Sequence, residues 1–277
     1  MTETTFGSTE LAVTQRDEIS SLLQSYLVQE AKLLPLVTDV SRYAVKGNKS
    51  VSFPRYGTAL DVKDKSEYTL VDDQTITYVD DQLDFNLHKY ISWVIEKRAD
   101  KQSVINTLQD MVMRVSKDLA LQVDKDIITQ LALASAAAPD HQISFAGATI
   151  VKSDILAARK LLLDQHLPAN ELYIGIGNSR EAEMLELDNF IDASKYGSAA
   201  PIQNAEFGRI YGMPVIRHTE FGDNMYMWHK SAVAFAFQIG AEFDSQKDLK
   251  NLGTRYSVDQ LYGVKVLDAG VRNVVTS

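Results

Sequence analysis

Two adjacent carboxylates, Asp80 and Asp81, are the residues of this chain whose type and spacing come closest to a catalytic metal site. They follow Tyr78 and Val79 in a strongly acidic stretch. Paired carboxylates at the tip of a hairpin hold two magnesium ions for in-line phosphoryl transfer when a third carboxylate comes from a neighbouring strand. A magnesium-dependent phosphoryl-transfer enzyme is therefore one function to weigh.

The surroundings of this pair favour a structural role instead. Tyr78-Val79-Asp80-Asp81 resembles the Tyr-x-Asp-Asp turn of reverse transcriptases, but four residues match easily by chance, and Val-Asp-Asp-Gln also occurs at positions 71–74. The chain has 28 Lys and Arg against 37 Asp and Glu, a net charge of −9, whereas a polymerase needs a basic surface for its template. We expect a solvated acidic loop rather than a metal site.

A glycine turn, Gly175-Ile176-Gly177-Asn178, is the second candidate. It follows an apolar strand and precedes a helix, which is the order found in nucleotide-binding loops. That fingerprint requires a third glycine three residues after the second, where this chain has Arg180. Asn178 and Glu181 have the spacing of an N-cap and its N3 partner, so a capped helix is the simpler interpretation. A nucleotide-dependent enzyme stays open as the alternative.

No other group of residues predicts catalysis, and we expect a protein that is not an enzyme and has no cofactor. The chain has no cysteine, so disulfides, thiolate metal sites and Cys nucleophiles are excluded. The five histidines, which are His88, His141, His166, His218 and His229, have no zinc-helix spacing. The N-terminus lacks an export leader and no apolar run reaches about 18 residues, so we expect a soluble, unexported product.

The elements that must position these residues predict an α+β fold. Apolar residues recur every three or four positions over 14–33 and, most clearly, over 103–134, a helix long enough to form the spine of a domain. Between residues 143 and 227 the pattern alternates between helix (153–165) and strand (172–176 and 213–217), and the chain then ends in strands.

An acidic ribbon precedes the long helix. A short strand at 50–54 is followed by residues 60–84, which hold eight acids and two lysines, a net charge of −6. Apolar and polar residues then alternate from Leu83 to Ile95, longer than the usual strand of about five or six residues. We predict a long hairpin that protrudes from the body, and such a ribbon needs a partner surface.

The second half of the chain resembles the major capsid proteins of tailed bacteriophages, which have the HK97-like fold. The most specific stretch is Phe207-Gly208-Arg209-Ile210-Tyr211-Gly212-Met213-Pro214-Val215, similar to the Gly-x-Ile-x-Gly-x-Pro-Val strand of that family. The strand at 172–176 with its following helix, Trp228 to Ala236, Arg255-Tyr256 and Tyr262 to Val266 also correspond. The matching motifs cover about residues 150–277, and the first half agrees in the order of its elements.

This resemblance implies four parts. They are an N-terminal arm (1–48), an extended β-hairpin loop (49–97), a peripheral domain with the spine helix and a β-sheet (98–137 and 238–262), and an axial α/β domain (140–237 and 263–277). No long cleaved N-terminal segment is present, which implies a separate scaffolding protein.

The function that the resemblance implies is self-assembly into hexamers and pentamers of an icosahedral phage head. Such a head encloses double-stranded DNA without sequence-specific binding, has a portal and in some cases a decoration protein, does not involve a membrane, and assembles in the host cytoplasm. A negatively charged lining suits a container that should not bind its DNA tightly.

The charged hairpin supplies the candidate contact residues between subunits. We expect Asp72, Asp73, Asp80 and Asp81 to face a basic strip on a neighbour, with Arg98, Lys101 and Arg114 as its candidates. Lys63 and Lys65 lie in the same hairpin; some viral shells join such a lysine covalently to an asparagine of a neighbour, but keeping the ribbon soluble is the simpler role.

Overall fold

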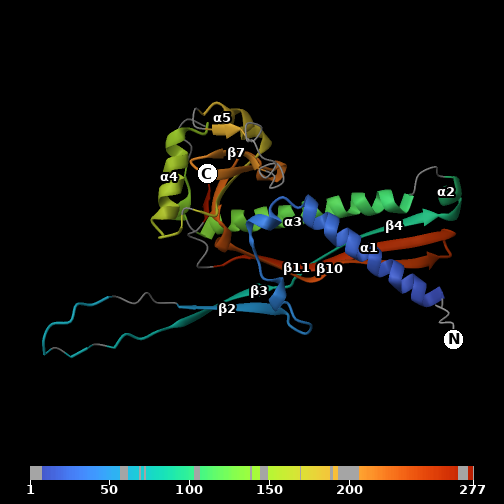
Figure 1. The fold of residues 1–277 in the computed structure, drawn as a ribbon, viewed down its shortest axis with the longest axis horizontal. Helices are drawn as coiled ribbons and strands as arrows, with labels where there is room; N and C mark the ends of the chain where they lie inside the picture. Colours follow the sequence, from blue (N-terminus) through green and yellow to red (C-terminus); the bar gives the residue numbers. More distant parts are fainter. Residues whose placement is uncertain are drawn as a thin grey trace, which may run out of the picture.

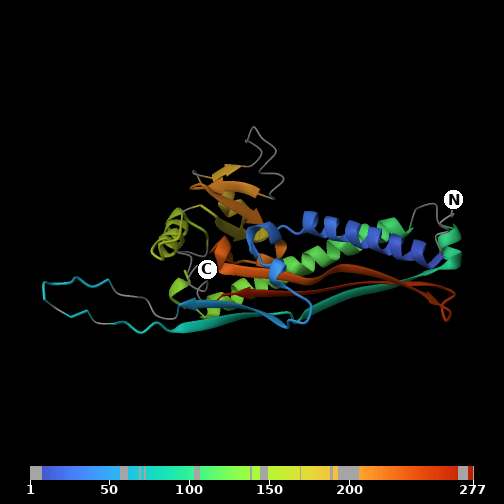
Figure 2. The same cartoon turned by 60° about the horizontal axis from the view of Figure 1, so that its bottom comes forward.

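The computed structural model describes residues 8–56, 62–68, 70–71, 73–102, 107–137, 139–143, 149–168, 170–187, 190–192, 206–267 and 274–276. These residues form a body of helices and two sheets, from which a two-stranded hairpin projects (Figures 1 and 2). The predicted α+β class is confirmed.

The spine helix α3 (Thr107–Ala137) confirms the strongest prediction from the sequence. Its apolar stripe is buried, and it includes Val112, Val115, Leu119, Val123, Ile127 and Leu131. Helix α1 (Ser8–Glu30) packs along α3 and buries Leu23 and Leu27 in the same core. It begins before the predicted Thr14. Figure 1 shows the two helices crossing the same face of the sheet below them.

That sheet has four strands in the order β1 (Thr38–Asp39), β10 (Val233–Asp248), β11 (Gly253–Val266) and β4 (Leu87–Glu96). Polar side chains of α1 complete the edge of β10, because Gln24 Oε1 accepts the Ala241 N–H at 2.8 Å and Ser20 Oγ accepts the Phe243 N–H at 3.0 Å. A short helix α2 (Lys97–Gln102) follows β4 at the far end of the sheet.

The single return strand predicted for residues 83–95 is wrong. Strand β3 (Tyr78–Asp84) pairs with β2 (Ser50–Tyr56) in the hairpin, whereas β4 is a separate strand that pairs with β11 from Tyr262↔Leu87 to Gly253↔Glu96. The reason is burial: Ile91 and Trp93 on one face of β4 pack against the core under α1 and α3. Alternation alone does not show which partner a strand will take.

The second module holds a six-stranded sheet of mixed direction. Its order is β12 (Val274–Thr276), β9 (Met225–His229), β5 (Leu172–Ile176), β8 (Met213–Arg217), β7 (Glu206–Ile210) and β6 (Phe190–Asp192). Helices α4 (Lys152–Leu163) and α5 (Glu181–Leu185) accompany this sheet. The predicted strands 172–176 and 213–217 are confirmed with the same bounds.

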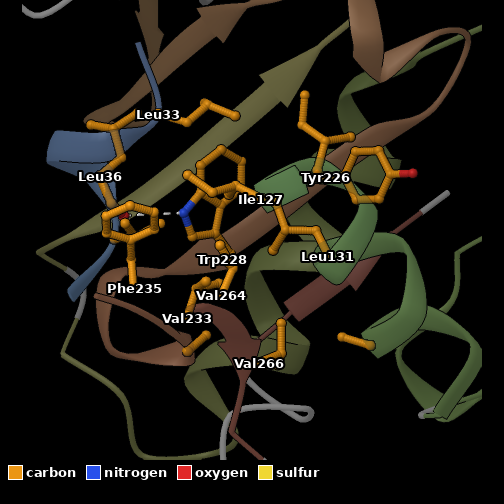
Figure 3. Packing of buried hydrophobic residues seen from close by; sticks show 14 of the residues in the cluster. Leu33, Leu36, Ile127, Leu131, Tyr226, Trp228, Val233, Phe235, Val264 and Val266 are labelled. Atoms are coloured by element: carbon orange, nitrogen blue, oxygen red, sulfur yellow. Dashed lines mark hydrogen bonds between the residues drawn. The ribbon is translucent and has the colours of Figure 1, made fainter. Parts of the chain in front are cut away.

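A core around Trp228 joins the two modules to the N-terminal segment. Trp228 on β9 is fully buried, and its Nε1 donates to the backbone oxygen of Leu36 at 3.3 Å, in the short 3-10 helix η1 (Leu34–Leu36). Ile127 and Leu131 of α3 and Val233 and Phe235 of β10 surround the indole (Figure 3). Three parts of the chain that are distant in sequence, namely η1, α3 and the consecutive strands β9 and β10, therefore share one core.

Candidate assembly surfaces

The geometry of Asp80 and Asp81 does not suit a pair of metal ligands. Both lie within β3, paired opposite Pro54 and Phe53, rather than at a hairpin tip. Successive side chains of a strand point to opposite faces. Asp81 is 3% exposed and its Oδ2 lies 2.9 Å from Arg55 Nε, whereas Asp80 is exposed and accepts a hydrogen bond from the Ser52 hydroxyl. In the described part of the chain no three His, Asp or Glu side chains are grouped to hold a metal ion.

The space above the glycine turn is filled by the protein itself. A Cβ on Gly175 would lie 2.4 Å from the Phe221 ring, and one on Gly177 would lie 1.7 Å from the backbone oxygen of Gly222. Glycine is needed here for close packing against the Phe221–Gly222 segment, which leaves no space for a side chain at either position. The predicted N-cap role of Asn178 is wrong: its Nδ2 donates to Thr219 Oγ1 at 3.1 Å, and the short helix that it opens has no side-chain cap.

Sequence reasoning missed two acids of the spine helix. Asp126 Oδ2 accepts the Tyr262 hydroxyl at 2.6 Å and lies 3.4 Å from Lys89 Nζ, so it ties α3 to β11 and β4. Asp124 is fully buried and accepts two backbone N–H groups of the segment after α1. The burial of Asp124 could have been predicted from its spacing. Ala120, Asp124 and Ile128 are four residues apart, so the acid lies between two apolar residues on the buried face of the helix.

The hairpin carries apolar side chains that meet almost nothing of its own chain. Val62 is 101%, Tyr68 97% and Leu70 96% exposed. Lys63, Lys65 and Glu67 are exposed between them, and Asp73 is exposed just after them. Asp72 lies outside the described residues. The hairpin extends away from the body in both views (Figures 1 and 2). A mixed apolar and acidic surface of this kind is typical of an interface.

The opposite end of the molecule is basic. A cavity of about 600 Å³ between the start of α2 and the β10–β11 turn is lined by Glu96, Lys97, Arg98, Lys250, Asn251 and Leu252. Leu249 and Leu252 in that turn are 86% and 70% exposed. Lys101 is exposed on α2, and Arg114 is exposed on α3. The predicted basic residues Arg98 and Lys101 therefore share this end with two exposed leucines.

None of the described helices has a stretch both long and apolar enough to cross a lipid bilayer. No family model and no curated protein matches the sequence.

Solved structures do match the fold. A structure from Mycobacterium phage Che8 is 20% identical, covers 87% of this chain and 88% of its own, and superposes with a TM-score of 0.64. The capsid of cyanophage P-SCSP1u is 13% identical over 87% and 85% of the two chains, with a TM-score of 0.66. The chain has the HK97-like fold of tailed-phage major capsid proteins. A virus-like particle from Pyrococcus furiosus is 8% identical, but it covers 95% and 98% of the two chains with a TM-score of 0.60.

The similarity to these structures is one of fold and extends over most of the chain. The similarity spans both modules and most of each compared chain, although identity stays at 20% or below. The resemblance found in residues 150–277 of the sequence therefore extends, at the level of the fold, to the N-terminal half.

Proposed function

We propose that this chain is the major coat subunit of a phage head, whose copies form the hexamers and pentamers of an icosahedral shell around double-stranded DNA. The fold supports this proposal, and the observation that carries it is the hairpin, where Val62, Tyr68 and Leu70 remain almost fully exposed. Apolar side chains on a projecting ribbon gain stabilisation only when another molecule covers them.

A second copy of the chain is the partner that this surface fits best. The hairpin, whose segment 60–84 carries −6 in the sequence, projects from one end of the molecule, whereas α2 lies at the other end. Helix α2 holds Lys97, Arg98 and Lys101, and Lys250 lines the same cavity as Lys97 and Arg98. Both ends also expose apolar side chains. Leu249 and Leu252 lie at the basic end, and the hairpin exposes Val62, Tyr68 and Leu70. A contact between unlike ends is heterologous, and repeated contacts of this type form rings when the rotation between neighbouring subunits closes.

Fewer acidic residues of the hairpin can contribute to this contact than the sequence predicts. Asp73 of the hairpin is exposed, and Asp72 belongs to the same acidic run. Asp81 is buried against Arg55 of its own hairpin, so it contributes to the framework of the ribbon and not to its contact surface. Asp80 is exposed beside Ser52 near the base. Lys63 and Lys65 are exposed on the same ribbon, where they keep it soluble.

The division into arm (1–48), extended loop (49–97), peripheral domain (98–137 and 238–262) and axial domain (140–237 and 263–277) is part of the proposal. We change one boundary: β4 pairs with β11, so residues 87–96 are counted with the peripheral sheet. We further propose a separate scaffolding protein, a portal and in some cases a decoration protein as partners, and assembly in the host cytoplasm into virions.

Microscopy of the purified chain tests the proposal directly. We expect negative-stain images to show capsomers, tubes or shells, and size-exclusion chromatography to show large species. The variant with Val62, Tyr68 and Leu70 all replaced by Ser should remain folded by circular dichroism but not assemble. A wild-type chain that stays a compact monomer at high concentration would contradict the proposal.

A charge-reversal pair tests the contact between unlike ends. We expect the double variant Arg98→Glu, Lys101→Glu to block assembly. Mixing this protein with subunits that carry Asp72→Lys and Asp73→Lys should restore assembly, because the reversed charges then attract each other. Lys160→Glu on α4 changes the charge of an exposed residue on the other module and is the matched control. Equal assembly of all these proteins would exclude this contact while leaving a coat function intact.

A further inference from the structure

The segment that leaves α1 is buried between the spine helix and the six-stranded sheet. Leu33 and Leu36 are buried in the Trp228 core, and Val37 follows them. At the centre of this junction lies Asp124 of α3, which is 0% exposed. Its two carboxylate oxygens accept the backbone N–H groups of Lys32 and Leu33, each at 3.0 Å. The Asp124 carboxylate thus fixes the backbone of the segment that follows α1 to the spine helix.

A histidine of the second module faces the same carboxylate. His218 precedes the short 3-10 helix η6 (Thr219–Phe221) and is also buried. Its Nδ1 accepts the Glu220 N–H at 3.2 Å, so the neutral ring carries its proton on Nε2, which lies 3.6 Å from Asp124 Oδ2. The His218 N–H donates to the Ile176 oxygen at the end of β5. Asp124 of the spine helix therefore faces two other parts of the molecule at once.

We propose that Asp124 is a proton-sensitive latch that sets how firmly the segment after α1 is held between the spine helix and the six-stranded sheet. A charged carboxylate in a dry core is costly unless its partners fully compensate it. Here the partners are two neutral N–H groups and a neutral imidazole. The charged groups nearby are exposed: Lys32, Glu220 and Lys125, whose Nζ lies 3.5 Å from Glu220 Oε2.

The direction of the response follows from the protonation of the two buried groups. Burial raises the pKa of Asp124 from 3.8 to about 6, against the opposing effect of its two hydrogen bonds and of Lys32. The closed junction binds this proton more tightly than an opened, hydrated one. Its contribution is complete below about pH 4 and is lost as the pH rises through about 6. The latch therefore tightens on mild acidification.

His218 acts in the opposite sense. Burial lowers the pKa of His218 below its usual 6.5, with Lys32 also lowering it and Glu220 opposing. The stability that this neutral ring contributes is present above about pH 6.5 and is lost as the pH falls through its lowered pKa. The expected response of the wild-type chain is the net result of these two opposing effects, and removing His218 should make the acid tightening larger.

Hydrogen–deuterium exchange of the full chain measures the opening of this junction. For Asp124 alone, we expect the opening equilibrium of residues 31–37 to fall about tenfold from about pH 7.5 to about pH 5, after correction for intrinsic exchange. Asp124→Asn should remove this decrease, and His218→Gln should enlarge it. Asp118→Asn changes an exposed acid of the same helix and should behave as the wild type.

Two outcomes would overturn the latch. One is an Asp124→Asn chain that keeps the full acid tightening. The other is a His218→Gln chain whose junction shows no tightening at acidic pH. This second result would overturn the proposal even if the Asp124→Asn chain fails to fold. The unassembled chain is sufficient for these measurements, so failure of the coat proposal leaves this test unaffected.

Discussion

The core around Trp228 and the projecting hairpin use apolar side chains in opposite ways. In the core, Trp228, Phe235 and Tyr262 are fully buried by elements of the same chain. In the hairpin, Val62 and Tyr68 are exposed almost as in an extended peptide. Burial of apolar area stabilises a fold in proportion to the area removed from water. The body is therefore stabilised by contacts within the chain, whereas these exposed side chains of the hairpin gain no such stabilisation from their own chain.

The largest loss of stability is expected for Trp228→Ala. The substitution empties the centre of the shared core and removes the hydrogen bond to Leu36. We expect the free energy of unfolding to fall by about 3 to 5 kcal/mol in urea denaturation. Tyr90→Ala removes an exposed aromatic of β4 and is the control, with a change within about 0.5 kcal/mol. Equal effects would show that Trp228 does not organise the core.

A smaller loss is expected for Gly177→Ala. The added methyl group would overlap the backbone oxygen of Gly222, so the two loops must separate, at a cost of about 1 to 3 kcal/mol in the same assay. Gly212→Ala is the comparison. Gly212 has open space around it, so any loss of stability there comes from the strain of an alanine at a positive φ of 82° and not from overlap. A Gly177→Ala protein as stable as the wild type would contradict the packing role and reopen the turn as a binding loop.

Within the hairpin, Arg55→Ala should act locally. It leaves the buried Asp81 carboxylate without its ion partner and costs about 1 to 3 kcal/mol of hairpin closure. We expect faster hydrogen exchange in β2 and β3 and an unchanged unfolding transition of the body. Lys46→Ala, which removes an exposed lysine near the base, is the control. A global loss of stability would show that hairpin and body form one cooperative unit.

The smallest effect on stability is expected where the effect on assembly is largest. Replacing Val62, Tyr68 and Leu70 together with Ser removes side chains that are already in water. The free energy of unfolding of the unassembled chain should change by less than about 0.5 kcal/mol. Differential scanning calorimetry below the assembly concentration measures this. A larger loss would mean that the hairpin packs on its own body and that the contrast between the two regions is false.

Much of the body could be predicted from local pattern. The spacing of Val112, Val115, Leu119 and Val123 identified the spine helix, because an amphipathic period requires no knowledge of the partner. Strands β5 and β8 were predicted with their bounds because short apolar runs between turn residues have few alternatives. The capsid resemblance likewise came from residues 150–277, where motifs are dense.

Pairing and burial could not be predicted in the same way. Asp80 and Asp81 are equivalent as letters, yet the register of β3 against β2 buries one and exposes the other. The alternation from Leu83 to Ile95 predicts one strand, but residues 87–95 pair with β11, a strand more than 150 residues later in the chain. Local sequence carries no information on such a distant partner.

Composition, charge and periodicity determined by themselves that this chain is an α+β protein with a long amphipathic helix, an acidic segment and no cysteine chemistry. Only the tertiary structure decided that Phe221 fills the glycine turn, that Asp124 is buried at the meeting point of three elements, and that the outer part of the hairpin projects from the body while Leu83 at its base is buried. The physical reason is that periodicity is a property of neighbours along the chain. Desolvation depends instead on which distant residues exclude water from a side chain.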